Sequence, residues 1–221
     1  MDQNDHTFRS QMDSFLTEPG PDRRVKILAW LSALVALCSN KRTRILLEMA
    51  FDEKIPVLHV KEIILQSYLF CGFPPAIEGL IVFNRVLHDR HLKDENFIDH
   101  RDPQKVMQDG LDLCGVVYGK NYAKLLSKMA HLSTDISQWM INEGYGKVLS
   151  RGILTIRERE LAVIAALGVQ RRKRQLISHI RGASHAGASK VEISSILSGL
   201  SVLTDTATAE DGMRVLNETL G

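Results

Sequence analysis

Apolar and polar positions recur along most of this chain with the spacing of amphipathic helices, and the alternation typical of β-strands is scarce. Ala, Leu, Glu, Arg and Lys dominate the periodic segments, and these residue types have high helix propensity. The pattern therefore predicts an all-α fold of about ten helices, with no sheet of consequence.

Local signals mark where several of these helices begin. Thr155 with Glu158, and Ser189 with Glu192, have the spacing of a capping box, in which a hydroxyl and a carboxylate each satisfy a backbone N–H group. The Asp-Pro pair at 102–103 is typical of an N-cap followed by a proline in the first helical turn. Helices are therefore expected to start at these three places.

The two halves of the chain show a weak internal repeat at a shift of about 130 residues, which bears on the architecture. At that shift the segment 59–65 falls on 189–195, while 78–87 resembles 211–220 after about three more residues. We expect two tandem helical units and a connector with helices of its own: a first unit at 23–90, the connector at 91–149 and a second unit at 150–221.

The pattern also predicts two helical hairpins, which bend near 39–40 and near 168–171. Glu160 and His179 lie at similar distances on either side of the second bend, so the two side chains would face each other across the hairpin. A carboxylate beside an imidazole is an arrangement suited to proton transfer near neutral pH. The spacing therefore indicates a candidate acid–base site.

Both residues also have structural interpretations. Glu160 shares a helix face with apolar residues, and burial disfavours the charged form of a carboxylate. One alternative is therefore a structural ion pair with Arg157, with Arg181 or with a basic residue of another subunit. A histidine on an apolar helix face, such as His179, is often a hydrogen-bonded core residue. The sequence leaves these alternatives open.

Composition narrows the class of protein. The chain has 221 residues and a net charge of +2, whereas a nucleic-acid binder usually concentrates far more Lys and Arg. Its longest apolar stretch, 27–38, is too short to span a membrane, and its polar first ten residues do not resemble a signal peptide. Cys38, Cys71 and Cys114 lack metal-ligand spacing, and we interpret them as small buried apolar residues. We expect a soluble cytoplasmic protein with no nucleic-acid or membrane partner.

The stretch LTIRERELAVIAALGVQRRKRQLISHIRGASHAGASKVEISSIL, which starts at Leu154, resembles the carboxymuconolactone decarboxylase and alkylhydroperoxidase D-like superfamily. The resemblance is strong over 146–221 and weaker in the first half, where it depends mainly on KEIILQSYLFCGFPPAIEGL, from Lys61 to Leu80. It implies a helical fold of two tandem units and a homo-oligomer, with a trimer favoured.

The resemblance also implies roles for individual residues. Glu160 and His179 match the glutamate and histidine of the peroxidase branch, but Arg172 and Gln175 stand where that branch has its two redox cysteines. Tyr145 stands where an aromatic residue is common ahead of the domain. The redox pair is therefore absent, while the proton-transfer pair is present.

The remaining site residues would bind the substrate. Arg181 or Arg172 would hold a substrate carboxylate, because a guanidinium group presents a rigid fork of donors; a solvated turn is the alternative for the basic run 171–174. Gln175 lies on one helical stripe with Arg172 and His179, and Tyr145 would partly close the site.

In the first unit, a shift of 130 places Trp30 and Met49 at the positions of the acid–base pair. Both are apolar, so we expect one functional unit per chain.

Three functions are compatible with these observations. The favoured one is a lyase that removes CO2 from a small carboxylated lactone or a related organic acid, without cofactor or metal, as the resemblance implies. The second is an alkylhydroperoxidase-like peroxidase or antioxidant protein, against which the missing cysteine pair argues. The third is a non-catalytic helical binding or scaffold protein.

Overall fold

The computed structural model describes residues 3–221, and this part of the chain contains helices and no strand, which confirms the predicted all-α fold. There are thirteen α-helices rather than about ten, because the connector and the end of the chain hold several short ones. The elements are α1 (Gln3–Thr17), α2 (Arg23–Ala36), α3 (Asn40–Asp52), α4 (Val57–Cys71), α5 (Phe73–Asp89), α6 (Pro103–Tyr118), the 3-10 helix η1 (Gly119–Asn121), α7 (Tyr122–Leu132), α8 (Thr134–Trp139), the π-helix η2 (Met140–Leu149), α9 (Ile156–Val169), α10 (Lys173–His185), α11 (Lys190–Ser198), α12 (Leu200–Leu203) and α13 (Thr206–Leu220).

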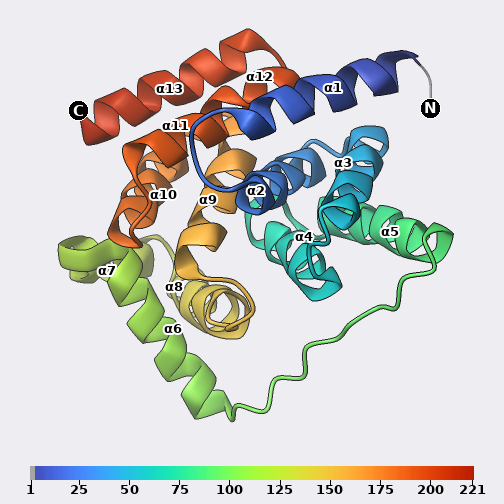
Figure 1. The fold of residues 1–221 in the computed structure, drawn as a ribbon. Helices are drawn as coiled ribbons and strands as arrows, with labels where there is room; N and C mark the ends of the chain where they lie inside the picture. The colour runs from blue at the N-terminus through green and yellow to red at the C-terminus, as the bar shows by residue number, and fades with distance from the viewer. Residues whose placement is uncertain (1–2) are drawn as a thin grey trace.

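Helices α2 and α9 form the centre of the molecule and pack along each other (Figure 1). Of their 14 residues each, 11 are buried in α2 and 12 in α9, so neither helix keeps a solvent-exposed face. A helix that is apolar all round is stable only when other elements surround it. Helices α3, α4 and α5 accordingly pack around the first of the pair, and α10, α11 and α13 around the second.

The helix ends follow the predicted signals. Both capping boxes are formed, at Thr155 with Glu158 and at Ser189 with Glu192, and the carboxylate of Asp102 accepts a hydrogen bond from the backbone N–H of residue 105. The two hairpins bend between α2 and α3 and between α9 and α10, at the predicted places. The predicted local starts and bends are therefore confirmed.

The register between the two helical units differs from the shift of about 130. The starts of α2, α3, α4 and α5 (Arg23, Asn40, Val57, Phe73) each precede the starts of α9, α10, α11 and α13 (Ile156, Lys173, Lys190, Thr206) by 133 residues. At this offset the positions of Glu160 and His179 correspond to Ile27 and Leu46, so the assignment to Trp30 and Met49 was wrong. Ile27 and Leu46 are buried and apolar. That the two units at 23–90 and 150–221 are copies of one another stays a prediction.

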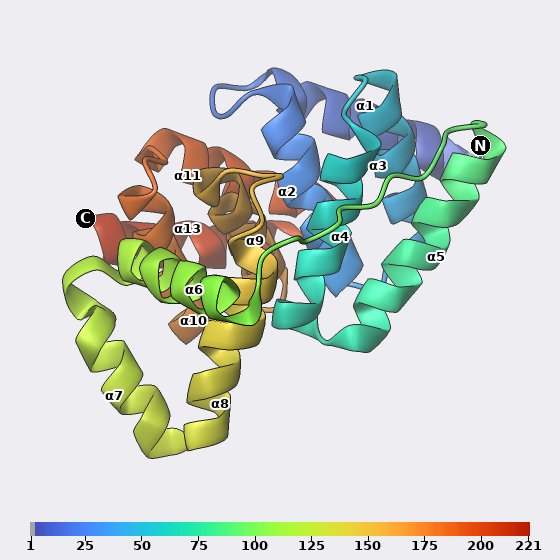
Figure 2. The same cartoon turned by 90° about the horizontal axis from the view of Figure 1, so that it is seen from below.

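The connector crosses the molecule and then forms a helical arm. Residues 90–102 run without helix along the surface, where Lys61 contacts Asp94 and the guanidinium group of Arg151 lies over Phe97 (Figure 2). Helices α6, α7, α8 and η2 follow, and α6 and η2 approach closely at Gly110 and Gly146. A Cβ atom on either glycine would lie within 3 Å of backbone atoms of the other segment, so this close approach requires glycine.

Trp30 joins the two halves of the core. Its side chain is fully buried, and its indole N–H donates a hydrogen bond of 3.0 Å to the carbonyl of Ile196 in α11. The ring also lies against Gly199, where an added Cβ atom would come within 2.2 Å of it. There is therefore no space for a side chain at position 199.

We expect Gly199→Ala to destabilise the fold by about 1–3 kcal/mol, because the new methyl group would overlap the Trp30 ring. Gly152→Ala is the matched control, since no atom lies within 4 Å of the position of its Cβ. Urea unfolding of both variants measures the difference. Equal stability of the two variants would contradict this account of the core.

Candidate acid–base site

Three consecutive charged residues, Glu158, Arg159 and Glu160, lie near the start of α9, and all three are buried. Successive residues of an α-helix point in directions roughly 100° apart. Each charge therefore faces a different neighbouring helix, and each needs its own partner because an unpaired buried charge is very unfavourable.

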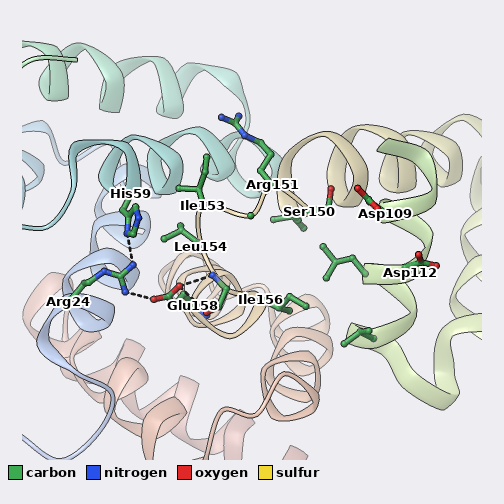
Figure 3. A pocket seen from close by; sticks show the side chains of 15 residues that line it. Arg24, His59, Asp109, Asp112, Ser150, Arg151, Ile153, Leu154, Ile156 and Glu158 are labelled. Atoms are coloured by element: carbon green, nitrogen blue, oxygen red, sulfur yellow. Dashed lines mark hydrogen bonds and ion pairs between the residues drawn. The ribbon is translucent and has the colours of Figure 1, made fainter. Parts of the chain in front are cut away.

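Glu158 belongs to an ionic contact with α2 (Figure 3). Its carboxylate accepts hydrogen bonds from Arg24 and from the backbone and hydroxyl of Thr155. Burial raises the pKa of Glu158, but these hydrogen bonds outweigh that effect, so its pKa lies below the ordinary value. Both the carboxylate and the guanidinium group are thus committed to a structural contact.

Arg159 belongs to a second ionic contact, with α4. Its guanidinium group donates to Glu62 at 2.8 Å, to Gln66 at 2.9 Å and to the carbonyl of Arg151 at 2.8 Å. Arg151 also forms an ion pair with Glu62 at 3.2 Å. This cluster holds α4 against α9 and engages both terminal nitrogens of Arg159, whereas its Nε has no hydrogen-bond partner in the described part of the chain.

Glu160 faces α10, where its Oε2 atom lies 2.9 Å from Nδ1 of His179. The residues are 2% and 7% exposed, respectively. The predicted contact across the hairpin is confirmed, and the alternative pairing with Arg157 is not present, because Arg157 pairs with Glu192. We call Glu160 and His179 the dyad.

The surroundings of the dyad leave room for this contact on one side and restrict the imidazole on the other. A Cβ atom at Gly182 would come within 2.8 Å of Glu160 Oε2, so glycine permits the approach of α10. The ring of Phe70 meets the imidazole of His179 edge-on, with centroids 5.3 Å apart. The imidazole is therefore fixed in orientation by a hydrogen bond and an aromatic contact.

The two imidazole nitrogens have different environments. A carboxylate can only accept, so Nδ1 of His179 carries the hydrogen of the bond to Glu160. Within residues 3–221, Nε2 has no hydrogen-bond partner, and His179 lines a cavity of about 440 Å³. The Nε2 atom is thus available to exchange a proton with a molecule in that cavity.

The cavity, which we call the dyad cavity, is mainly apolar and aromatic. Its lining comes from α4, from the connector elements and from α10: Leu69, Phe70, Tyr118, Met129, Ile136, Trp139, Met140, Glu143, Gly144, Tyr145, Leu149, Gln175 and His179. The π-helix η2 supplies five of these residues, and π-helices are rare elements that often occur at functional sites.

Three groups beside the dyad stay protonated at neutral pH. Burial raises the pKa of Tyr118 to about 12, and it also raises the pKa of Tyr145. Cys114 is fully buried, and burial together with the nearby charge of Glu160 raises the pKa of its thiol to about 12. A thiol in this state is a poor nucleophile.

The other predicted site residues are divided between two places. Gln175 and Tyr145 line the dyad cavity, as expected of residues that contact a substrate there. Arg181 lies two residues after His179 on α10 and lines a neighbouring pocket instead. Arg172 is exposed at the N-cap of α10 and lines neither hollow, so its position does not support a substrate contact in this chain.

Two further groups of findings concern ligands and membranes. Among residues 3–221, no group of three or more His, Cys, Asp or Glu side chains is placed to hold a metal ion. No helix in the same range combines the length and apolar character needed to cross a membrane.

Comparison with known proteins supports the resemblance. Residues 137–218, which include the dyad, match the sequence model of the carboxymuconolactone decarboxylase family. This segment is a carboxymuconolactone decarboxylase family domain. A relative, Peroxisomal protein 2 of Schizosaccharomyces pombe (strain 972 / ATCC 24843), is 37% identical over 79 residues, which cover 35% of this chain and 37% of the relative. The match spans little more than a third of either chain.

A larger hollow of about 760 Å³ lies between the family domain, α2 and α6, and it holds several charged groups (Figure 3). Most of these charges pair with a neighbour: Arg24 with Glu158, Arg151 with Glu62, and Asp109 with Arg101. Mutual pairing leaves little electrostatic attraction for a ligand. The dyad cavity is therefore the better candidate for the site, although it is the smaller hollow.

His59 in this larger hollow has a defined protonation state. Its Nδ1 lies 2.6 Å from Nη2 of Arg24, and because a guanidinium group can only donate, the imidazole must accept and is neutral. Burial and the charge of Arg24 lower the pKa of His59 below 6.5. The neighbouring carboxylates of Glu158, Glu95 and Glu62 act in the opposite direction but are outweighed.

The depressed pKa of His59 predicts a pH dependence of stability. The unfolded chain binds a proton at His59 below a pH of about 6.5 and the folded chain resists it, so folding stability falls as the pH drops through that region. His59→Gln keeps a hydrogen-bond acceptor for Arg24 but has no titrating group at this position. Its folding stability should therefore fall less between pH 7.5 and pH 5.5 than that of the unmodified protein. Thermal unfolding at both pH values measures this, with the exposed His131→Gln as control. Identical pH dependence of His59→Gln and the unmodified protein would refute the assignment.

Proposed function

We propose that this protein is an acid–base enzyme in which the dyad transfers a proton to or from a carbon atom of a small organic acid, without a cofactor. The observation that carries the proposal is the buried 2.9 Å contact between Glu160 Oε2 and His179 Nδ1, with Nε2 unpaired beside a mainly apolar cavity. A carboxylate that holds an imidazole in this way fixes its tautomer and orientation and stabilises the imidazolium that forms during proton transfer.

Decarboxylation, the reaction for which the family is named, fits this arrangement. When a substrate carboxylate leaves as CO2, the electron pair of the broken bond remains on the carbon atom. The Nε2–H of the protonated His179 then donates its proton to that carbon, Glu160 stabilises the imidazolium until transfer, and water returns a proton to Nε2. The dyad supplies the acid of this step. The apolar cavity disfavours the ionised carboxylate of the substrate relative to the neutral products of decarboxylation.

The lining of the cavity bears on which organic acid is accepted. Glu143 is its one charged residue; hydrogen bonds from Tyr68 and Lys147 lower the pKa of Glu143, so it is ionised. An additional carboxylate placed inside this cavity would meet no cation. A substrate with a largely apolar body therefore fits better than a compact lactone with several carboxylates.

A non-catalytic binding role is the second candidate. It is favoured by the relative named Peroxisomal protein 2, whose name states no reaction. The same name offers the peroxisome as an alternative to the cytoplasmic location expected from the cysteines. The two roles differ in one measurable property, which is the rate of proton transfer. A binding protein requires the geometry of the dyad, whereas an enzyme also requires the dyad to transfer a proton.

The homo-oligomer, with a trimer favoured, stays a prediction. Large apolar side chains are exposed on α5 (Phe73, Ile77 and Ile81) and on the connector arm (Leu132, Ile136 and Trp139). Contiguous apolar surface of this kind is common where protein chains associate, and this supports the expectation.

Proton transfer can be measured with 5-nitrobenzisoxazole, an uncharged aromatic carbon acid whose ring opens when a base removes one proton. We expect His179→Ala and Glu160→Gln to lower the rate constant of ring opening by about 10²–10⁴-fold, the usual contribution of a general base. His131→Ala, an exposed histidine of α7, is the matched control and should keep the full rate. Unchanged rates in both dyad variants would reject the enzymatic proposal and leave the binding role.

We also expect no thiol-dependent peroxidase activity. Arg172 and Gln175 occupy the redox positions, and burial raises the pKa of Cys71 to about 11 and that of Cys114 to about 12. Thiols with such pKa values form little thiolate at neutral pH. Consumption of cumene hydroperoxide in the presence of dithiothreitol is the measurement. Robust turnover that disappears in Cys38→Ser, Cys71→Ser or Cys114→Ser would contradict this expectation.

A further inference from the structure

A small pocket of about 240 Å³ next to the dyad cavity is lined by cations and by no acid. Its residues come from α6, η1, α7 and α10: Val117, Tyr118, Asn121, Lys124, Leu125, Lys128, Ser178, Arg181 and His185. We call it the basic pocket. Three basic side chains, Lys124, Lys128 and Arg181, thus converge on one hollow together with a histidine.

These cations lack the ion pairs that most other basic residues of the protein form. Within residues 3–221, Lys124, Lys128 and Arg181 make no ion pair, whereas Lys61 and Lys105, for example, each contact a carboxylate. Like charges that converge without an anion repel one another. The arrangement is therefore electrostatically complementary to a negatively charged group.

Polar groups in the same pocket add hydrogen-bonding capacity. His185 donates from Nδ1 to the carbonyl of Val117 at 2.8 Å, which fixes the imidazole at the edge of the pocket. The hydroxyl of Ser178 donates to the carbonyl of Arg174 at 3.3 Å, so the donor left for a ligand among these groups is the side-chain amide of Asn121. An arginine fork, two ammonium groups and this amide form a suitable set for a carboxylate or a phosphate.

The basic pocket adjoins the dyad cavity. Tyr118 lines both hollows. On α10, Gln175 and His179 line the cavity, while Ser178 and Arg181, at neighbouring positions of the helix, line the pocket. One elongated molecule could therefore contact both.

We propose that the basic pocket binds the anionic group of the substrate, a carboxylate or a phosphate, while the apolar part of the same molecule occupies the dyad cavity. This inference rests on the proposed function, and it narrows the substrate to an amphiphile that carries an anionic group at the end remote from the reacting carbon. It gives Arg181 the anion-binding role expected from the sequence, and it adds Lys124 and Lys128.

Binding can be tested with probes of one chain length. Decanoate and decyl phosphate carry the anion, decanol carries only the apolar chain, and acetate carries only the carboxylate; all are used below the concentrations at which they form micelles. We expect calorimetric titration to show tighter binding of the two long anions than of decanol or acetate. Comparing decanoate with decyl phosphate then identifies which anion the pocket prefers.

Fluorescence places the bound molecule. Trp30 is fully buried in the core, whereas Trp139 is 62% exposed and lines the dyad cavity. Decanoate should change the tryptophan emission of the unmodified protein but not that of Trp139→Phe. An emission change that persists in Trp139→Phe would place the ligand elsewhere and overturn the proposal.

Variants test the charges directly. Arg181→Gln and the double variant Lys124→Gln/Lys128→Gln should each weaken decanoate binding at least about tenfold at low salt and leave decanol binding unchanged. Arg174→Gln removes the same charge from an exposed position of α10 outside the pocket, and should bind decanoate normally.

Equal decanoate affinity in Arg181→Gln, the double variant and Arg174→Gln would overturn the anion pocket, as would equal affinity of the unmodified protein for decanoate and decanol. Neither result affects the ring-opening test, because 5-nitrobenzisoxazole carries no anionic group. Loss of proton transfer and loss of anion binding are therefore distinguishable.

Discussion

Burial of three consecutive charges near the start of α9 is the constraint on which the rest of the structure depends. Glu158, Arg159 and Glu160 point away from one another on a helix that has no exposed face, and moving each charge out of water costs several kcal/mol. The surrounding helices must therefore supply partners in three directions. Arg24 of α2, Glu62 of α4 and His179 of α10 do so, and these contacts fix where the three helices lie around α9.

The three contacts differ in what they leave unsatisfied. Glu158 and Arg159 each form several hydrogen bonds, and their partners include backbone groups and a side-chain amide, which do not exchange protons readily. We therefore regard these two contacts as structural. The dyad joins a carboxylate to an imidazole, and one imidazole nitrogen has no hydrogen-bond partner in the described part of the chain and lies beside a cavity. In our proposal, the basic pocket holds the anionic group of the substrate outside that cavity, so that it does not neutralise Glu160.

Features set within one hairpin or one helix turn could be predicted from the sequence, and features set by distant packing could not. The capping boxes, the bends and the Glu160–His179 contact depend on residues close in the chain. The register of the repeat was wrong by three residues, because a slip of nearly one helical turn keeps the same face of each helix inward. Apart from Tyr145 and Gln175, the cavity wall could not be assigned, nor could Lys124, since they depend on how α6, α7 and α8 are placed beside α10.

The central claim is that Glu160 fixes His179 with the hydrogen on Nδ1 and with Nε2 open to the cavity. Long-range ¹H–¹⁵N correlation spectra of the imidazole nitrogens test it directly, with the His179 signals assigned from their absence in His179→Asn. The account predicts a protonated Nδ1 in the native protein at neutral pH and a changed Nδ1 resonance in Glu160→Gln. A neutral imidazole protonated only at Nε2, or an Nδ1 resonance unaffected by Glu160→Gln, would contradict it.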